Sequence, residues 1–157
     1  MLRISKLSDY AIIVLGQMAR APEKTFAAHE LAEASGIGTP TASKVLKTMA
    51  KAGLLASTRG AHGGYQLALT PEQTSIASII AALEGPIALT ECGLAHNHCD
   101  QSQTCHVQGN WSLINRAIQT ALEAITLADM TQPMKRAPDA FHIPLHQVAM
   151  HRPRPQE

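Results

Sequence analysis

The residues best suited to chemistry gather in one short segment of this chain of 157 residues. All three cysteines fall within a window of 14 residues: Cys92, Cys99 and Cys105. Three histidines lie between or beside them: His96, His98 and His106. Thiolates and imidazoles are metal ligands, and a thiolate can also be oxidised. The segment is therefore expected to hold a metal or to act as a thiol switch.

The cysteine spacing favours a ligand larger than a single zinc ion. Six residues separate Cys92 from Cys99, and five separate Cys99 from Cys105. Structural zinc sites usually use pairs only two to four residues apart, so that one tight turn supplies two thiolates. The wider gaps fit a loop wrapped around an iron–sulfur cluster. Three thiolates leave one ligand missing, which a His or a carboxylate must supply. Zinc and a thiol redox switch remain alternatives from these residues alone.

Catalysis finds little support in the sequence. It contains no phosphate-binding glycine loop, no paired catalytic carboxylates and no nucleophile elbow. Cys105 and His106 are adjacent, which does not orient a general base onto the thiolate. The sequence predicts a protein that is not an enzyme and has no small-molecule substrate.

Composition predicts packed helices in a reducing compartment. Hydrophobic residues make up 45% of the chain, but aromatic residues only 3%, so the core must consist of aliphatic side chains. That suits helices better than a β-sandwich or barrel. The longest apolar runs are far shorter than the ~20 residues of a membrane span. No signal-peptide pattern opens the chain. We expect a cytoplasmic protein with no membrane partner.

Three helices are predicted in the first 52 residues. The first starts with Ser8 as its cap and runs to about residue 20, and the second covers about residues 28–36. After a tight turn, Thr39 caps the third helix and Pro40 occupies its first position. Apolar residues form one face of the third helix: Ala42, Val45, Leu46 and Met49. Its other face carries Thr41, Ser43, Lys44, Lys47 and Lys51.

A β-hairpin follows the third helix. Residues 54–59 and 65–69 flank a glycine-rich turn, and Tyr65, Leu67 and Leu69 alternate with Gln66 and Ala68 as in a half-buried strand. Helices, turn and hairpin together predict a winged helix-turn-helix, so the fold class is mainly α with a small β-hairpin wing.

Two further helices are predicted beyond the wing. Residues 75–84 form a capped helix ended by Gly85 and Pro86. A long helix runs from Asn110 to about Met130, with a seam of residues spaced as in a coiled coil: Ile114, Ile118, Ala121, Ile125 and Ala128. We expect this helix to make a homodimer. The alternative is a seam against the chain's own first helix.

These predictions divide the chain into four parts. Residues 1–85 form the DNA-binding domain, 86–109 the cysteine-rich loop, 110–131 the dimerisation helix and 132–157 a proline-rich flexible tail.

The charge distribution predicts a polyanionic partner. Residues 1–70 carry eight Lys or Arg residues against four acidic ones, whereas residues 71–134 carry one against six. Double-stranded operator DNA fits this imbalance. The third helix would contact the major groove through Thr39, Thr41, Ser43, Lys44 and Lys47. Arg59 and His62 of the wing would reach the minor groove, and a dimer would read a pseudo-palindrome.

Three stretches resemble the Rrf2 family of bacterial regulators: residues 2–11 (LRISKLSDYA), residues 59–67 (RGAHGGYQL) and the loop with three cysteines. The resemblance covers about residues 1–130. It implies a homodimeric winged-helix repressor or activator whose iron–sulfur cluster reports on cluster status, oxidants or nitric oxide. It also implies that Cys92, Cys99 and Cys105 are the thiolate ligands and that Arg59 enters the minor groove. The pattern is most similar to the regulators of SUF-type assembly genes.

The resemblance leaves the fourth ligand open. Members of the IscR type use a His three residues after the last cysteine, where this chain has Gln108. Members of the NsrR type use an Asp near the start of the first helix, supplied by the other subunit, and Asp9 matches that position. His106 is the local alternative. A 2Fe–2S cluster is favoured, and 4Fe–4S is the other option. The first cysteine gap is six rather than the family's usual five, which leaves the cluster type open.

Overall fold

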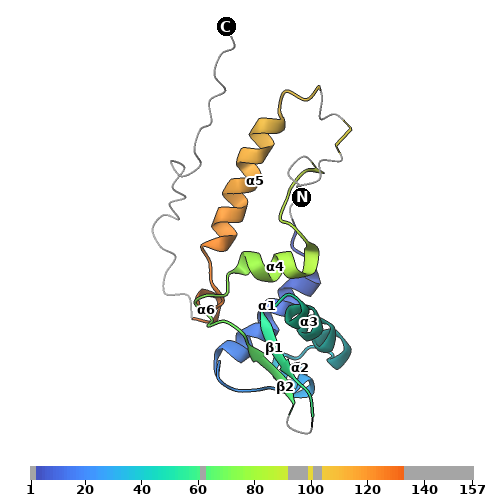
Figure 1. Cartoon of the computed structure of the whole chain (residues 1–157), viewed down its shortest axis with the longest axis vertical. Coiled ribbons are helices and arrows are strands. Elements are labelled where there is room, and N and C mark those ends of the chain that lie inside the picture. The colour runs from blue at the N-terminus through green and yellow to red at the C-terminus, as the bar shows by residue number, and fades with distance from the viewer. Residues whose placement is uncertain (1–2, 61–62, 92–98, 101–103, 133–157) are drawn as a thin grey trace.

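The computed structural model describes residues 3–60, 63–91, 99–100 and 104–132. Within these ranges it contains six helices and one hairpin, confirming the predicted fold class (Figure 1). The elements are α1 (Lys6–Ala19), α2 (Ala28–Ser35), α3 (Thr39–Lys51), β1 (Leu55–Thr58), β2 (Gly64–Leu67), α4 (Ile76–Glu84), α5 (Gln108–Glu123) and α6 (Leu127–Thr131). Expectations for His62, Cys92, His96, His98 and the tail from residue 133 concern residues outside this description. Across these ranges, no helix has both the length and the apolar composition of a membrane-spanning segment.

Helix α1 begins earlier than the sequence suggested. Ser5, not Ser8, is the cap: its side chain accepts a hydrogen bond from the Ser8 backbone N–H at 3.2 Å. Ser8 instead lies in the first turn and is fully buried. A cap needs an extended backbone outside the helix, which Ser5 has and a residue already inside the helix lacks.

The core of the winged domain forms where α1, α2, α3, α4 and the hairpin meet. Helix α3 contributes its predicted apolar face, because Ala42, Val45, Leu46 and Met49 are all fully buried. Its start differs from the prediction: Gly38 holds the cap position and Thr39 is already helical, with no side-chain cap bond. Pro40 tolerates this first turn because no intrahelical partner exists there for its missing N–H.

The hairpin is antiparallel, with Leu55 opposite Leu67 and Thr58 opposite Gly64. Phe26 pairs with Tyr65 of the second strand in an isolated antiparallel bridge, in which the two backbones exchange two hydrogen bonds of 2.8 Å. The second strand is shorter than predicted: Leu67 is buried, but Leu69 lies beyond the strand and is 43% exposed.

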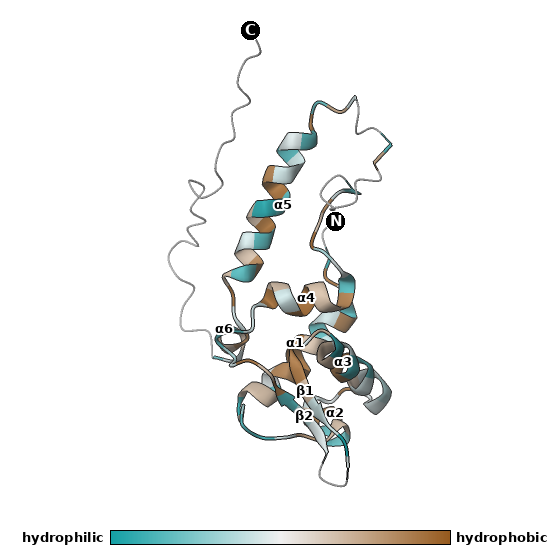
Figure 2. Ribbon diagram, in the orientation of Figure 1, coloured by the Kyte–Doolittle hydropathy of each residue, from teal (hydrophilic) through white to brown (hydrophobic). Residues whose placement is uncertain are grey.

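The predicted long helix is two helices. Helix α5 ends at Glu123, and α6 begins at Leu127 after a break in which Thr126 forms an antiparallel bridge with Ser75. Helix α6 packs against α1, and Leu127 is fully buried in the core of the winged domain. The C-terminal end of the predicted seam therefore packs against the chain's own first helix, which was the alternative to a homodimer. Helix α5 extends away from the domain and alternates apolar with hydrophilic residues along its length (Figures 1 and 2).

Candidate functional site

The turn between α2 and α3 fixes the direction of the outward helix face. Gly36 ends α2 in the left-handed region, with a φ of 67°, which favours glycine. The Ile37 N–H then bonds the Ala32 carbonyl at 3.0 Å, and the Ile37 side chain enters the core. Because the buried Ile37 side chain holds the turn in place, packing and backbone hydrogen bonds together fix the angle between α2 and α3.

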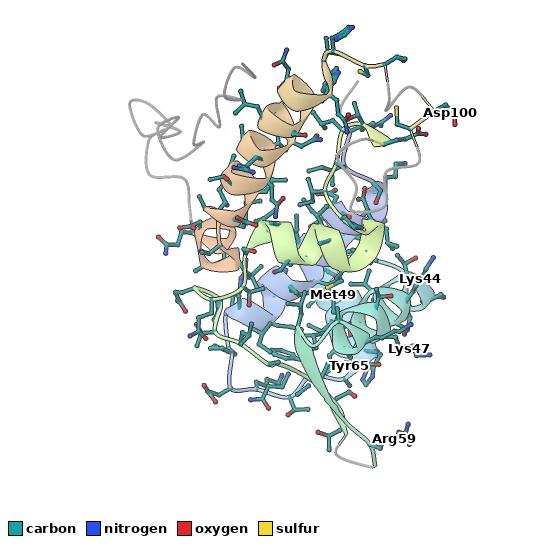
Figure 3. All side chains as sticks on the ribbon, turned by 45° about the horizontal axis from the view of Figure 1, so that its top comes forward. Lys44, Lys47, Met49, Arg59, Tyr65 and Asp100 are labelled. Carbon is teal, nitrogen blue, oxygen red and sulfur yellow. The ribbon has the colours of Figure 1, made fainter. Side chains whose placement is uncertain are left out.

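The outer face of α3 is polar and basic, as predicted. Lys44 and Lys47 are exposed and point away from the domain, whereas Met49 points into it (Figure 3). Thr39 is exposed, and Thr41 and Ser43 are half-buried at the edge of this face. Hydroxyl and ammonium groups on one exposed helix face are suited to hydrogen bonding with phosphates and base edges.

Glycines allow the wing to lie close to its neighbours. A Cβ atom on Gly64 would come within 2.4 Å of the Phe26 carbonyl oxygen, and one on Gly63 within 2.3 Å of the Thr58 carbonyl oxygen. Neither position can accept a side chain without moving the backbone. Arg59 follows β1, is exposed and extends outward at the far end of the hairpin (Figure 3). His62, its predicted companion, lies outside the described residues.

The cations of α3 and the wing are not neutralised by ion pairs. In the described ranges a single ion pair occurs, between Lys24 and Glu30 at 3.8 Å. Lys24 also lies 4.6 Å from the centre of the Phe26 ring. The backbone N–H of Ala27 donates to Glu30, and together with Lys24 it lowers the pKa of that carboxyl. Lys44, Lys47 and Arg59 therefore present unpaired positive charge to an anion.

The thiols that the structure describes are half-buried. Cys99 and Cys105 lie between α4 and α5, and they are not joined in a disulfide. Cys92 falls outside the described ranges. Among the residues described, no three His, Cys, Asp or Glu side chains come together as a metal site. The donor types fit an iron–sulfur cluster or zinc, but the described part of one chain does not assemble a complete ligand set.

Asp9 lies in the first turn of α1, where its carboxylate is exposed. Close by, Glu84 at the end of α4 accepts hydrogen bonds from the Ser5 backbone N–H at 3.1 Å and from the Ser8 hydroxyl. These donors, Ser8 first, lower the pKa of the Glu84 carboxyl. The contact joins the start of the helix that carries Asp9 to the point where the chain leaves α4 toward the cysteines.

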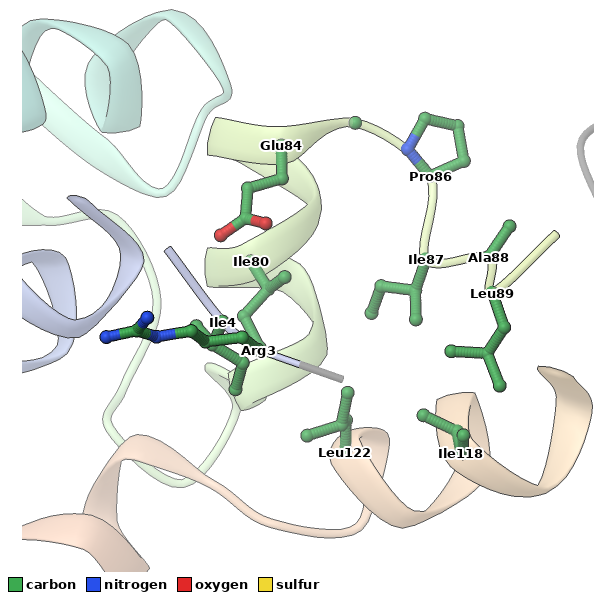
Figure 4. Close-up of a pocket in the computed structure, with 11 residues that line it drawn as sticks. Arg3, Ile4, Ile80, Glu84, Pro86, Ile87, Ala88, Leu89, Ile118 and Leu122 are labelled. Carbon is green, nitrogen blue, oxygen red and sulfur yellow. The ribbon is translucent and has the colours of Figure 1, made fainter. Parts of the chain in front are cut away.

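A cavity of about 510 Å³ lies between the N-terminal segment, α4 and α5 (Figure 4). Its wall is mainly apolar and includes Ile4, Ile80, Ile87, Leu89, Ile118 and Leu122. Further along α5, large apolar side chains are exposed: Trp111, Leu113 and Ile114. His106, the local alternative ligand, is exposed just ahead of α5.

Sequence reasoning missed two polar residues at this junction, Glu84 and Asn115. From the sequence, Glu84 is recognisable only as the last residue of a helix that ends at Gly85. Asn115 lies on α5 and is only 7% exposed; its side-chain oxygen accepts the Leu89 backbone N–H at 2.8 Å. One signal was available, since Asn115 is polar between Ile114 and Ile118 on a helix with an apolar face.

Comparison with known proteins agrees with this geometry. The family model Rrf2, described as "Iron-dependent Transcriptional regulator", matches residues 4–133. Protein rrf2 of Nitratidesulfovibrio vulgaris is 29% identical over 138 residues, covering 87% of this chain and 92% of that protein. The regulator IscR of Aliivibrio salmonicida is 25% identical over 130 residues, covering 82% of this chain and 77% of that protein.

Solved structures show the same relationship. The global cysteine regulator CymR of B. subtilis has a TM-score of 0.64 at 26% identity, covering 83% of this chain and 97% of that one. IscR of T. potens has a TM-score of 0.61 at 28% identity, covering 82% of this chain and 85% of that one. Helix-turn-helix, wing and family model agree: the chain belongs to the Rrf2 family of DNA-binding transcriptional regulators, which are not enzymes.

Proposed function

We propose that the protein is a dimeric repressor or activator that senses iron–sulfur cluster status, oxidants or nitric oxide through a bound iron–sulfur cluster, and that it controls iron–sulfur assembly genes of the SUF type. The observation that carries the proposal is the position of the cysteines. Cys99 and Cys105 are half-buried thiols in the segment between α4 and α5, that is, between the winged domain and its projecting helix. The similarity to IscR of two species supports it.

Operator recognition is assigned to the predicted residues of α3 and the wing. Lys44 and Lys47 would neutralise phosphates in the major groove, and the hydroxyls of Thr39, Thr41 and Ser43 would bond phosphates or base edges. Arg59 would enter the adjacent minor groove, with His62 beside it. The exposure and unpaired charge of Lys44, Lys47 and Arg59 support this assignment.

Cys92, Cys99 and Cys105 would hold the cluster, and Asp9 from the second subunit would be its fourth ligand. When bound, the cluster supplies a redox-active iron centre. The exposed carboxylate of Asp9 suits a ligand offered to another chain. Asp9→Asn and His106→Ala distinguish the two candidates, because only loss of the true ligand should change the electron paramagnetic resonance signal of the reduced cluster.

Dimerisation is assigned to the exposed apolar residues of α5. Trp111, Leu113 and Ile114 are each more than a third exposed, which is uncommon for such large apolar side chains on one helix. Ile114→Glu should shift the protein toward monomer in analytical ultracentrifugation. Ser112→Glu, at an exposed polar position of the same helix, is the matched control and should leave the dimer intact.

The regulatory mechanism follows from connectivity. The thiol segment, residues 85–107, joins α4 to α5. Ordering or releasing this segment would therefore change the distance between the two winged domains of a dimer. A bound group shifts that equilibrium only by its differential affinity for the two arrangements.

The deciding experiment measures iron and acid-labile sulfide per monomer, with a visible spectrum, on protein purified without oxygen. About two of each indicates a 2Fe–2S cluster and about four of each a 4Fe–4S cluster. Cys99→Ala and Cys105→Ala should lose iron and change operator affinity in the same direction as cluster removal. Unchanged operator binding by these variants would refute the sensing mechanism.

A second candidate is a repressor of the same fold that responds to zinc or thiol oxidation. The similarity to CymR, a cysteine regulator, favours it, as do two half-buried thiols in one segment. One zinc per monomer without sulfide, or a change in DNA affinity on thiol oxidation alone, would select this function.

A further inference from the structure

The segment that leaves α4 is fastened at two points before it reaches the cysteines. At its start, Glu84 accepts hydrogen bonds from Ser5 and Ser8 of the α1 terminus. Five residues later, the Leu89 backbone N–H donates to the side chain of Asn115 on α5. Between these points, Ile87 and Leu89 line the apolar cavity against Ile118 and Leu122 of α5 (Figure 4). The segment is thus held by both the winged domain and the projecting helix.

Asn115 is an unusual residue for its position. It is the one buried residue of α5, whose neighbours Ile114 and Arg116 are exposed. Its oxygen bonds Leu89, but its Nδ2 is buried and has no hydrogen-bond partner among the described residues. A buried amide with one group unpaired is less favourable than an apolar side chain of the same shape. Packing therefore does not explain the asparagine, whereas the bond to the Leu89 backbone does.

The surroundings of this bond make it effective. The Asn115 side chain is buried and Leu89 is half-buried, and a hydrogen bond shielded from water is stronger than one exposed to it. Without the Asn115 oxygen, the Leu89 N–H would be left unpaired at a half-buried position. The side chain therefore fixes one backbone position of the segment to one turn of α5.

We propose that Asn115 is the positioning residue that couples the cysteine segment to α5. It holds Leu89 on α5, so that a change at the thiols, which begin three residues beyond Leu89, moves α5 relative to α4. Without this bond the thiols still hold their ligand, but its presence no longer alters the spacing of the winged domains. The inference rests on the proposed regulation by the thiol segment and adds the residue that transmits it.

The test compares the full-length parent with Asn115→Leu, which keeps the size and removes the acceptor. Amide hydrogen exchange at Leu89 is measured first and needs no bound cluster. We expect exchange to be about tenfold faster in the variant, the factor that one ordinary hydrogen bond represents. The second readout is the ratio of operator Kd values with and without the cluster. It should fall toward one in the variant, while iron and sulfide content and the operator affinity of the cluster-free protein stay at parental values.

Two further variants make the result decisive. Gln119→Leu makes the same change at an exposed position of α5 and should alter neither readout. Asn115→Ala also removes the acceptor, with a smaller side chain, and should change both readouts in the same direction; it provides the test if Asn115→Leu does not fold. Parental exchange at Leu89, or a parental Kd ratio, in Asn115→Leu would overturn the inference. Failure of the proposed function looks different, because the parent itself would then show a ratio of one.

Discussion

At the scale of single residues, the carboxylate of Glu84 makes stability depend on pH. Its hydrogen bonds from Ser8 and Ser5 hold the pKa below the ordinary 4.5. A depressed pKa in the folded state means that the ionised form stabilises the fold. This contribution is complete above pH 4.5 and is lost as the pH falls through the lowered pKa.

We therefore predict that Glu84→Gln destabilises the protein at pH 6 but much less at pH 3. Urea unfolding of both proteins across this range measures the difference in unfolding free energy. The control is the same substitution in a Ser8→Ala background, where the largest cause of the shift is absent and the pH-dependent difference should shrink. A difference that stays constant with pH would mean that the carboxylate acts only by packing.

The exposed cations lead to a prediction about salt. If Lys47 contacts a phosphate, Lys47→Ala should weaken operator binding and flatten the plot of log affinity against log salt by about 0.9, the value for one neutralised phosphate of B-DNA. Arg59→Ala should instead lose affinity mostly for operators with a narrow minor groove near the wing. Arg116→Ala, an exposed cation on α5, is the control and should preserve the salt slope. Fluorescence anisotropy titrations at several salt concentrations provide these values.

The sequence indicated residues whose chemistry is local and missed those defined by distant contacts. The outward face of α3 was predictable because helical spacing alone separates Lys44 and Lys47 from Leu46. Glu84 and Asn115 were not, since their partners Ser8 and Leu89 lie 76 and 26 residues away in the chain. The cap of α1 was predicted three residues too late, at Ser8, because Ser5 and Ser8 offer the same capping chemistry.

At the scale of elements, the break between α5 and α6 is the main departure from the predicted structure. Spacing alone allows one helix from residue 110 to 130, because apolar residues continue through Ile125 and Ala128. The break comes from backbone pairing: Ile76 N–H bonds Ile125 and Leu127 N–H bonds Thr74. A local signal was present, since Thr126 and Asp129 form a capping box in which each side chain bonds the other residue's backbone N–H.

This break predicts that Leu127 stabilises the winged domain and not the dimer. Leu127 is fully buried and its helix packs on α1, so Leu127→Ala should cost about 2–5 kcal/mol of unfolding free energy. Met130→Ala, on the same short helix but 52% exposed, should change stability by about 0.5 kcal/mol at most. Chemical unfolding gives both values, and sedimentation gives the oligomeric state. If Leu127→Ala instead turned a dimer into monomers without lowering the unfolding free energy, Leu127 would belong to the dimer seam that the sequence predicted for one long helix.

At the scale of the whole molecule, charge and shape are arranged along one axis. Lys44 and Lys47 of α3 and Arg59 of the wing lie away from Asp100 and from the projecting end of α5 (Figure 3). This segregation explains why a net charge of only +1 is compatible with a DNA-binding protein. It was predictable from the sequence because the basic and acidic halves follow one another along the chain.

A dimer held through α5 would present its two winged domains at a fixed separation, which predicts a strict dependence on operator geometry. Inserting about five base pairs between the half-sites turns the second one to the opposite face of the duplex. Affinity should then fall at least about tenfold, toward that of a single half-site. An operator of the original length with a scrambled centre is the control and should keep most of its affinity. Ile114→Glu protein, as a monomer, should bind the normal and the lengthened operator equally. Equal affinity of the parent dimer for both operators would show that its two winged domains do not bind DNA as one rigid unit.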